Sequence, residues 1–431
     1  YRTYIFEDTL KRMLSYNGLA VKHVMNITDV GHLTSDEDEG EDKMATSARK
    51  EGKTVWEIAA YYTDYFKKDL TLLNIINPDI WCKATDHIPE MIALIQRLEK
   101  NGLTYIAGGN VMFDVSKFPN YGQLARLNLD AQRAGLRVEV DEQKRSPHDF
   151  VLWFTRSKFG NQDMQWESPW GRGFPGWHIE CSAMSMKYLG EQFDLHCSGV
   201  DHIPVHHTNE IAQSEGATGK KWVNYWMHGE FLQVDGGKMS KSLGNVYLIE
   251  DLIKKGFHPL AYRYFCFTGH YRSQLNFTWE SLTAAQRALE NLRSEVSKLR
   301  ADPTLNPSPR GEGGGEVSFK QRFLDAINDD LNLPQGIAVL WDTVKSSELS
   351  PSQKLALIGD YDRVLGLDLL EKKEGSGIPR EVEELLQKRQ EARAAKDWAG
   401  SDAIRGQILA LGYVVEDGKG GQTVREKKFG E

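Results

Sequence analysis

The chain has 431 residues, of which 40% are hydrophobic and 26% charged, a composition typical of an ordinary globular protein with about two to four domains. A net charge of -8 excludes indiscriminate binding to nucleic acid but leaves room for a local basic stripe. No apolar run is long enough to span a bilayer, and four cysteines without paired spacing do not suggest a disulfide framework. We therefore expect a protein of the reducing cytoplasm.

The N-terminal segment predicts an amphipathic helix that ends near Gly18, where a C-cap is expected. One face of this helix carries Ile5, Phe6, Leu10, Met13 and Leu14. The continuous apolar run 19–30 then predicts a buried strand. A helix that leads directly into such a strand is the second half of a βαβ unit, so we expect the first strand and its phosphate-facing turn to precede Tyr1.

The middle of the chain predicts a change of architecture. Residues 31–54 are acidic and polar and predict an exposed loop, and helices are expected from about 54 to 101. We interpret the region from about 55 to 175, above all its strand-rich part 102–175, as an insertion between two halves of a nucleotide-binding fold. Strand patterns return at FDLHCSG and WVNYWMHGEFLQV.

Helical periodicity dominates after Asn245, and a Pro/Gly-rich linker interrupts it at ADPTLNPSPRGEGGGE. We expect a catalytic domain over 1–245, a helical region over 246–300, a helical bundle over 317–370 and a small domain over 378–431.

The pentapeptide Lys238-Met239-Ser240-Lys241-Ser242 is the most specific motif in the chain. Two ammonium groups three residues apart, with two hydroxyl groups and flanking glycines, suit a loop that closes over polyphosphate. The alternative is a flexible basic surface loop.

A cluster of soft and nitrogen ligands precedes this motif. Half of the chain's 12 histidines fall within about fifty residues; they are His178, His196, His202, His206, His207 and His228. Glu210 follows His206 by four residues, which places both on one helical face, and Cys181 would add a thiolate from another segment. Sulfur, imidazole and carboxylate together suit zinc, and three protein ligands leave a position for a substrate atom. Taken singly, Cys181 could be a small buried hydrophobe and the pair His206 and Glu210 a solvated helical contact.

The segments PGWHIECSAM, HHTNEIAQ, YWMHGEF, KMSKSLGN and GHYRSQLNF, in this order and at these distances, resemble the cysteinyl-tRNA synthetases, a family of class I aminoacyl-tRNA synthetases. The likeness runs from Tyr1 to the end and includes FLDAINDDLN and ARAAKDWAGSDAIRGQILALGYVVED. It implies an α/β fold: a Rossmann-like catalytic domain with an inserted subdomain, followed by helical tRNA-binding domains. It also implies a cytoplasmic, monomeric enzyme that activates L-cysteine with ATP and magnesium and transfers it to tRNA-Cys.

The resemblance assigns roles residue by residue. Cys181, His206 and Glu210 match the family's ligands for one zinc ion per chain, and the fourth family ligand is a cysteine that precedes a HIGH-type motif. Trp177 matches the family's tryptophan that closes over the substrate side chain. Thr28 and Asp201 match positions that line the family's amino-acid pocket.

The same resemblance places ATP at the pentapeptide. Lys241 matches the lysine that contacts ATP, with Ser240 and Ser242 beside it, and Lys238 and Lys241 would stabilise the departing phosphates. His228 could line the nucleotide site or be an ordinary packed histidine. The tail carries basic and aromatic residues that could meet RNA, or that belong to an ordinary charged helix; they are Arg389, Arg393, Lys396, Trp398 and Arg405.

The HIGH-type motif and the cysteine before it do not occur in this sequence, and we expect both to precede Tyr1. Without them, zinc would keep three ligands and activity would be very low. Two alternatives therefore stay open. One is a cysteine ligase of mycothiol-type biosynthesis, against which the segment 317–431 speaks. The other is a catalytically impaired tRNA-binding remnant, which the retained lysine motif and metal ligands oppose.

Overall fold

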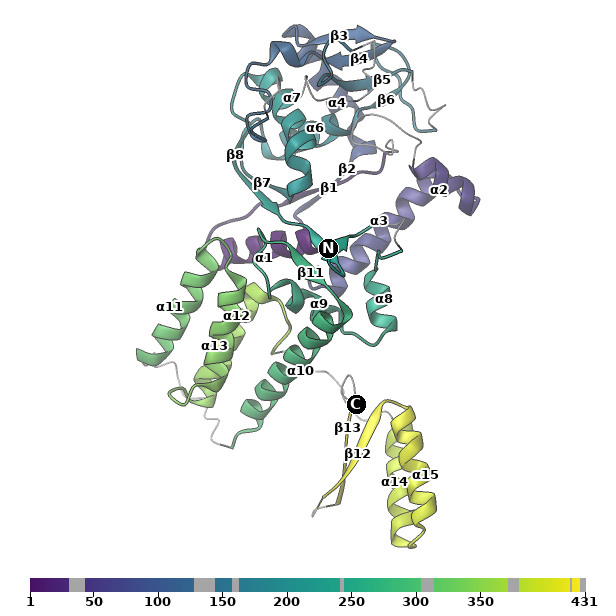
Figure 1. Ribbon diagram of the computed structural model, residues 1–431, viewed down its shortest axis with the longest axis vertical. Helices are drawn as coiled ribbons and strands as arrows, with labels where there is room; N and C mark the ends of the chain where they lie inside the picture. The colour runs from purple at the N-terminus through teal and green to yellow at the C-terminus, as the bar shows by residue number, and fades with distance from the viewer. Residues whose placement is uncertain are drawn as a thin grey trace. The chain divides into compact units, whose positions relative to one another are not determined.

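The fold is taken from a computed structural model (Figure 1). The residues that it describes are 1–30, 43–127, 144–156, 163–240, 244–303, 314–370, 380–418 and 421–426. They cluster into two compact units: unit 1 is Tyr1–Leu243, Cys266–Phe277 and Ala326–Pro334, and unit 2 is Gly244–Phe265, Thr278–Asp325 and Gln335–Glu431. Within the described residues, no helix combines the length and the apolar character that a bilayer span requires.

The predicted N-terminal helix and strand are both present in unit 1. Helix α1 (Arg2–Tyr16) buries Ile5, Phe6 and Leu10, and Gly18 just beyond it has a φ of +84° that suits its glycine. Strand β1 (Val24–Ile27) is shorter than the apolar run that predicted it, and it pairs in parallel with β2 (Ile80–Lys83).

For the following segment, the expected loop was wrong in part, and the expected helices are present with a strand that was missed. Helix α2 (Lys43–Glu51) occupies part of the range predicted as a loop, while residues 31–42 of that loop lie outside the described residues. The helical stretch expected from about 54 to 101 consists of α3 (Val55–Leu72) and α4 (Ile88–Lys100), with β2 between them. A capping box of Thr54 and Glu57 fixes the start of α3.

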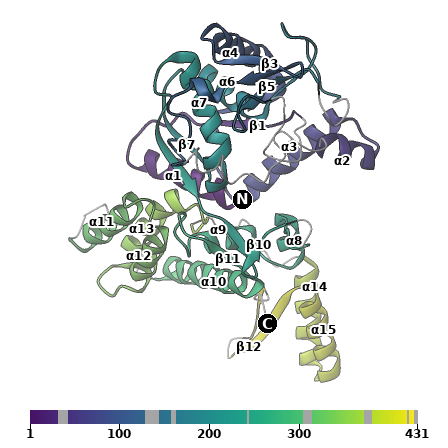
Figure 2. The same ribbon diagram turned by 45° about the horizontal axis from the view of Figure 1, so that its top comes forward.

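The predicted strand-rich segment contains strands, and they form an antiparallel sheet. Its order is β3-β4-β5-β6, and its strands are β3 (Thr104–Ala107), β4 (Asn110–Phe113), β5 (Phe150–Phe154) and β6 (Phe174–Pro175). One apolar core joins this sheet to α4, α6 (Trp177–Leu189) and α7 (Thr208–Thr218). Figures 1 and 2 show the three helices gathered beside the sheet.

A second parallel pair follows in unit 1. Strand β7 (Phe193–Gly199) pairs with β8 (Val223–Gly229), and both match segments predicted as strands. Beyond β8, a small sheet has the order β10-β9-β11, and its strands are β9 (Leu232–Val234), β10 (Gly237–Lys238) and β11 (Leu275–Phe277). Strand β11 was not predicted, because its three residues lie between helical patterns.

The chain after Asn245 is mainly helical, as predicted. Its helices are α8 (Ile249–Lys254), α9 (Pro259–Cys266), α10 (Trp279–Ala301), α11 (Gly314–Asn328), α12 (Leu333–Lys345), α13 (Pro351–Leu365), α14 (Arg380–Ala394) and α15 (Trp398–Ala410). Most of the predicted linker, residues 304–313, lies outside the described residues. The last described elements, β12 (Tyr413–Gly418) and β13 (Gly421–Glu426), form an antiparallel hairpin that packs with α14 and α15 around Val382, Ile408 and Val415.

Candidate active site

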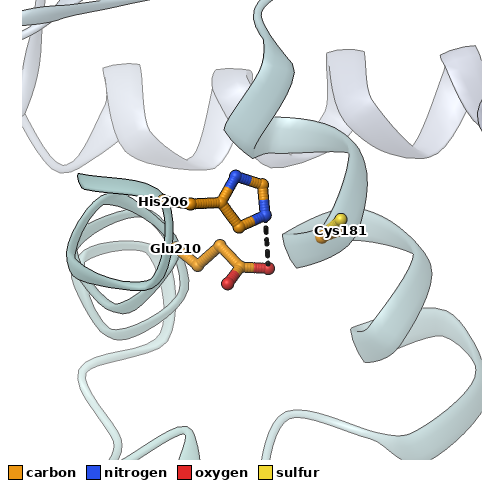
Figure 3. Close-up of side chains that lie close together, drawn as sticks. All are labelled: Cys181, His206 and Glu210. Atoms are coloured by element: carbon orange, nitrogen blue, oxygen red, sulfur yellow. Dashed lines mark ion pairs between the residues drawn. The ribbon is translucent and has the colours of Figure 1, made fainter. Parts of the chain in front are cut away.

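Three neighbouring segments bring the predicted metal ligands together. Cys181 lies on α6, His206 lies in the π-helical turn Ile203–His207, and Glu210 lies in the first turn of α7. One ligand atom from each residue lies within 4.8 Å of the other two, and His206 Nε2 is 3.7 Å from Glu210 Oε1 (Figure 3). The structure thus assembles the three residues into one potential metal site.

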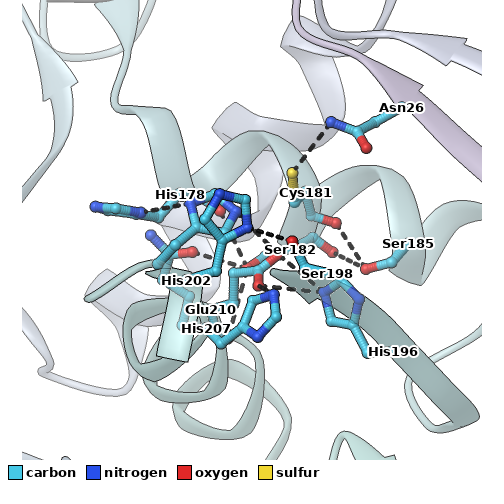
Figure 4. A network of polar contacts seen from close by, with 12 residues as sticks. Asn26, His178, Cys181, Ser182, Ser185, His196, Ser198, His202, His207 and Glu210 are labelled. Carbon is cyan, nitrogen blue, oxygen red and sulfur yellow. Dashed lines mark hydrogen bonds and ion pairs between the residues drawn. The ribbon is translucent and has the colours of Figure 1, made fainter. Parts of the chain in front are cut away.

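Glu210 also faces a second group of imidazoles. His196, on β7, places Nε2 3.2 Å from Glu210 Oε2, and His207 Nε2 lies 3.8 Å from the same oxygen. His196, His207 and Glu210 therefore form another set with ligand distances within 4.8 Å (Figure 4). The Glu210 side chain is fully buried, so its charge must be offset within this cluster.

Further polar contacts orient the cluster. His178 Nδ1 lies 3.0 Å from His206 Nδ1, and His207 Nδ1 lies 2.8 Å from His228 Nε2. The sequence had paired only His206 with Glu210, by their spacing, and had singled out the other histidines by their density alone. Burial lowers the pKa of His207 far below its usual range and lowers the pKa of His228 to about 4, so both imidazoles are neutral near pH 7. Neutral imidazole is the form that binds metal.

The Cys181 thiol completes a donor set that fits zinc. Its pKa is raised well above the ordinary value by burial first and then by the charges of Glu210 and Glu180. A bound cation would reverse both effects, because a coordinating thiol is deprotonated. Asn26 Nδ2 donates to Cys181 Sγ over 3.5 Å, a contact that the sequence analysis did not anticipate.

Trp177 lies beside the metal ligands because Gly176 allows a close backbone approach. A Cβ added at Gly176 would lie 2.1 Å from the carbonyl oxygen of Val151 on β5, so α6 starts directly against that strand. The Trp177 ring centroid is then 4.5 Å from that of His206. A substrate side chain that reached the metal would lie near this indole.

Thr28 and Asp201 approach the same cluster from two other segments. Thr28 follows β1, and its Oγ1 accepts a hydrogen bond of 3.2 Å from the Asn26 amide that also faces Cys181. Asp201 follows β7, is exposed, and has an oxygen 4.0 Å from His202 Nε2. A Cβ at Gly199 would lie 2.3 Å from Asp201 Oδ1, so the Asp201 side chain packs directly over Gly199. Their roles toward a substrate stay predictions.

The lysine motif follows strand β9, where a preceding strand was predicted, and its first residue lies in a β-hairpin. Lys238 lies on β10 opposite Gln233 of β9 and is exposed. The intervening turn has positive φ at Asp235 (50°) and Gly236 (75°), the Asp-Gly pattern that favours a tight hairpin. Ser240 is among the described residues, whereas Lys241 and Ser242 lie outside them.

Comparisons with known proteins show the family of the chain. Residues 1–287 match the family model of the tRNA synthetases class I (C) catalytic domain, and residues 375–425 match that of the cysteinyl-tRNA ligase anticodon binding domain. The cysteine–tRNA ligase of Treponema denticola is 49% identical over 446 residues, covering 98% of this chain and 91% of that protein. Cysteine–tRNA ligase 1 of Burkholderia lata is 51% identical over 425 residues, covering 98% and 88%. The chain belongs to the cysteinyl-tRNA synthetase family.

The fold of the family is recognisable in distant solved structures as well. Mycobacterium tuberculosis methionyl-tRNA synthetase in complex with methionyl-adenylate matches with a TM-score of 0.56 and 16% identity, covering 85% of this chain and 86% of that chain. At this identity the likeness concerns the fold alone. It confirms the predicted class I synthetase architecture.

Two of the tail residues that the sequence singled out differ in their exposure. Arg389 is buried and forms a two-pronged ion pair with Asp417, both contacts at 3.0 Å, so it is not available to RNA. Trp398 is 59% exposed, with the Arg393 guanidinium 5.8 Å from its ring centroid. Among the basic and aromatic tail residues singled out from the sequence, Arg389 is therefore structural, whereas Trp398 is not a packed core residue.

Proposed function

We propose that this chain is a cysteine–tRNA ligase that activates L-cysteine with ATP and transfers cysteine from the adenylate to the 3′ end of tRNA-Cys. The observation that carries the proposal is the meeting of Cys181, His206 and Glu210 beside Trp177. It occurs in a chain that is about half identical to two curated cysteine–tRNA ligases over 98% of its length.

Cys181, His206 and Glu210 would hold one zinc ion. When bound, zinc supplies a soft Lewis acid that prefers the thiolate of cysteine to the hydroxyl of serine, a distinction that an apolar pocket makes poorly. The Asn26 amide favours the charged form of the Cys181 sulfur, because a donor stabilises a thiolate. Trp177 would cover the substrate side chain, and Thr28 and Asp201 would line the rest of the amino-acid pocket.

The lysine motif would act on the nucleotide. Attack of the cysteine carboxylate on the α-phosphorus of ATP expels pyrophosphate, so negative charge develops on the leaving group. The ammonium groups of Lys238 and Lys241 would offset that charge, and the hydroxyls of Ser240 and Ser242 would donate hydrogen bonds to the phosphates. Magnesium would bind together with ATP, as part of the nucleotide substrate.

We propose that the regions of the chain have the roles that the family resemblance implies. The catalytic domain would cover 1–245 with its insertion within about 55–175, the region 246–300 would contact the tRNA stem, and the domains 317–370 and 378–431 would bind the anticodon arm. We place the protein in the cytoplasm as a monomer. Four free thiols, at Cys82, Cys181, Cys197 and Cys266, agree with a reducing compartment.

ATP–pyrophosphate exchange tests this proposal on the protein expressed from its own gene. Exchange should depend on cysteine, should be far weaker with serine, and should fall when zinc is chelated. Cys181→Ala should lose bound zinc, whereas Cys197→Ala, on the neighbouring strand β7, should keep it. Equal exchange with serine, or exchange unaffected by chelation, would refute zinc selection. Binding of tRNA-Cys without any exchange would favour the impaired remnant.

A further inference from the structure

Arg2 is a buried arginine whose guanidinium joins three separate segments of unit 1. It is 7% exposed and lies at the start of α1. Its Nη1 donates to the carbonyl oxygens of Glu230 and Phe231, both over 2.8 Å. Its Nη2 donates to the carbonyl oxygens of His270, over 2.9 Å, and Ser273, over 2.5 Å. One side chain thus satisfies four backbone acceptors that belong to two distant loops.

These carbonyls stand at the base of the hairpin that carries Lys238. Glu230 and Phe231 connect β8 to β9, and Ser273 leads into β11, which pairs in parallel with β9. From β9 the chain turns tightly into β10, where Lys238 lies opposite Gln233. Arg2 therefore ties the base of the β9–β10 hairpin to helix α1.

The turn of the same hairpin has its own anchor. The Gly236 amide donates to Asn276 Oδ1 on β11 over 2.8 Å, and the Asp235 amide donates to the carbonyl oxygen of Phe277 over 3.0 Å. The hairpin is thus held at its base by Arg2 and at its turn by Asn276.

Only arginine can make the contact at the base. Its planar fork presents donors on two nitrogens in fixed directions, whereas lysine concentrates its donors on a single nitrogen. A second arginine on α1 offers a contrast. Arg12 donates to Asp8 Oδ2 over 2.8 Å and to the carbonyl oxygen of Asn74 over 2.7 Å, and neither residue belongs to the hairpin. These contacts of Arg12 secure the helix, and their partners lie outside the hairpin.

We propose that Arg2 is a positioning residue for the adenylation step, because it fixes the β9–β10 hairpin and with it the direction from which Lys238 meets the phosphates of ATP. This inference rests on the proposed role of Lys238. Arg2 itself acts through backbone carbonyls. Its loss should therefore affect the nucleotide side of the reaction and spare the metal and the amino-acid pocket.

Steady-state exchange kinetics of Arg2→Lys test the inference, with Arg12→Lys as the matched control on the same helix. In Arg2→Lys, kcat/KM for ATP should fall roughly tenfold to a hundredfold, the scale expected for misplacing a reacting group by about 1 Å. Zinc content and the KM for cysteine should stay at wild-type values. Arg12→Lys should not change the ATP parameters selectively. Asn276→Ala, which loosens the turn, should shift them in the same direction as Arg2→Lys.

Two results would overturn the inference: wild-type ATP parameters in both Arg2→Lys and Asn276→Ala, or a parallel loss of zinc, cysteine binding and ATP use in Arg2→Lys and Arg12→Lys. If Arg2→Lys does not fold, Asn276→Ala alone decides.

Limited trypsin digestion supplies a readout that needs no catalysis. Cleavage after Lys238 should be several times faster in Arg2→Lys and Asn276→Ala than in wild type or Arg12→Lys. Equal cleavage rates in all four proteins would contradict the anchoring. Absence of exchange in the wild-type protein would refute the proposed function instead, and the digestion would still report on the hairpin.

Discussion

At the scale of single residues, Glu210 is the centre of the site. Its fully buried carboxylate lies within 4 Å of His196, His206 and His207, and one of its oxygens also belongs to the set with Cys181. A buried carboxylate is costly unless positive charge compensates it. The lowered pKa of His207 keeps its imidazole neutral, so this ring does not supply the positive charge. A bound metal ion would supply it.

Replacing Glu210 by glutamine tests this conclusion with almost no change of shape. Glu210→Gln should bind zinc much more weakly, and its zinc content after dialysis should fall by roughly tenfold or more, the range for damaged metal sites. Inductively coupled plasma mass spectrometry measures the content. Glu215→Gln, on the same helix, is the control and should keep its zinc, because Glu215 only accepts a hydrogen bond from the Trp222 amide. Full zinc content in Glu210→Gln would show that the carboxylate is not a ligand.

His23 gives a separate prediction about pH. Burial first, and then the charge of Lys11, lower the pKa of His23 from 6.5 to about 4. The folded state therefore binds this proton less tightly than the unfolded state. The resulting stability is fully present above about pH 6.5 and is lost as the pH falls toward 4.

Urea unfolding at about pH 7.5 and about pH 5 measures this loss. The urea concentration at the unfolding midpoint of the wild-type protein should be lower at the lower pH. This decrease should be smaller in His23→Gln, because glutamine has no proton to gain. An identical pH dependence in the two proteins would assign the acid sensitivity to other groups.

At the scale of elements, the sequence predicted those helices and strands whose own residues show a clear hydrophobic periodicity. Periodicity and glycine placement predicted three such elements: helix α1, strand β7 at FDLHCSG, and the strand before the lysine motif. Strand β2 was missed because its four residues become a strand only by pairing with β1, where Val24 lies opposite Ile80. Helix α2 was missed because KMATSARKE is mostly polar, and Met44 and Ala48 form its packed face.

Contacts within the site were predictable only where the residues are close in the sequence. The spacing of His206 and Glu210 predicted a shared helical face, and the π-helical turn before α7 indeed keeps both residues at the cluster. The contacts of Asn26 with Cys181 and of Arg2 with four carbonyls join segments more than 150 residues apart. No local pattern reveals such contacts, because they arise only when the strands and helices pack.

Gly176 is the element-scale feature on which the placement of α6 depends. In Gly176→Ala, the added methyl group would meet the Val151 carbonyl at 2.1 Å, so the start of α6 must move away from β5. We expect a loss of about 1–3 kcal/mol of stability, as for other overpacked sites, together with weaker zinc binding. Chemical denaturation and zinc titration measure the two effects. Gly406→Ala, where the added Cβ meets nothing within 4 Å, should be tolerated. Unchanged stability and zinc affinity in Gly176→Ala would mean that α6 adjusts freely.

At the scale of the whole molecule, the C-terminal segment has the features of an independent module. Its helices α14 and α15 and its hairpin share a core of their own. Arg389 ties α14 to both hairpin strands, because it also donates to Gln422 Oε1 over 2.8 Å while pairing with Asp417. This bridge agrees with the match of residues 375–425 to an anticodon-binding model, since a module that reads RNA needs a fixed surface.

Removing the module should therefore separate the two halves of the reaction. A chain that ends at Leu370 keeps every described residue of the candidate site, so cysteine-dependent ATP–pyrophosphate exchange should stay close to that of the parent protein. Aminoacylation should lose about tenfold or more in kcat/KM for tRNA-Cys, because each tenfold corresponds to only about 1.4 kcal/mol of lost binding. In the intact chain, Arg389→Met should give a smaller loss of the same kind. Equal losses of exchange and aminoacylation would instead mean that the module supports the catalytic domain itself.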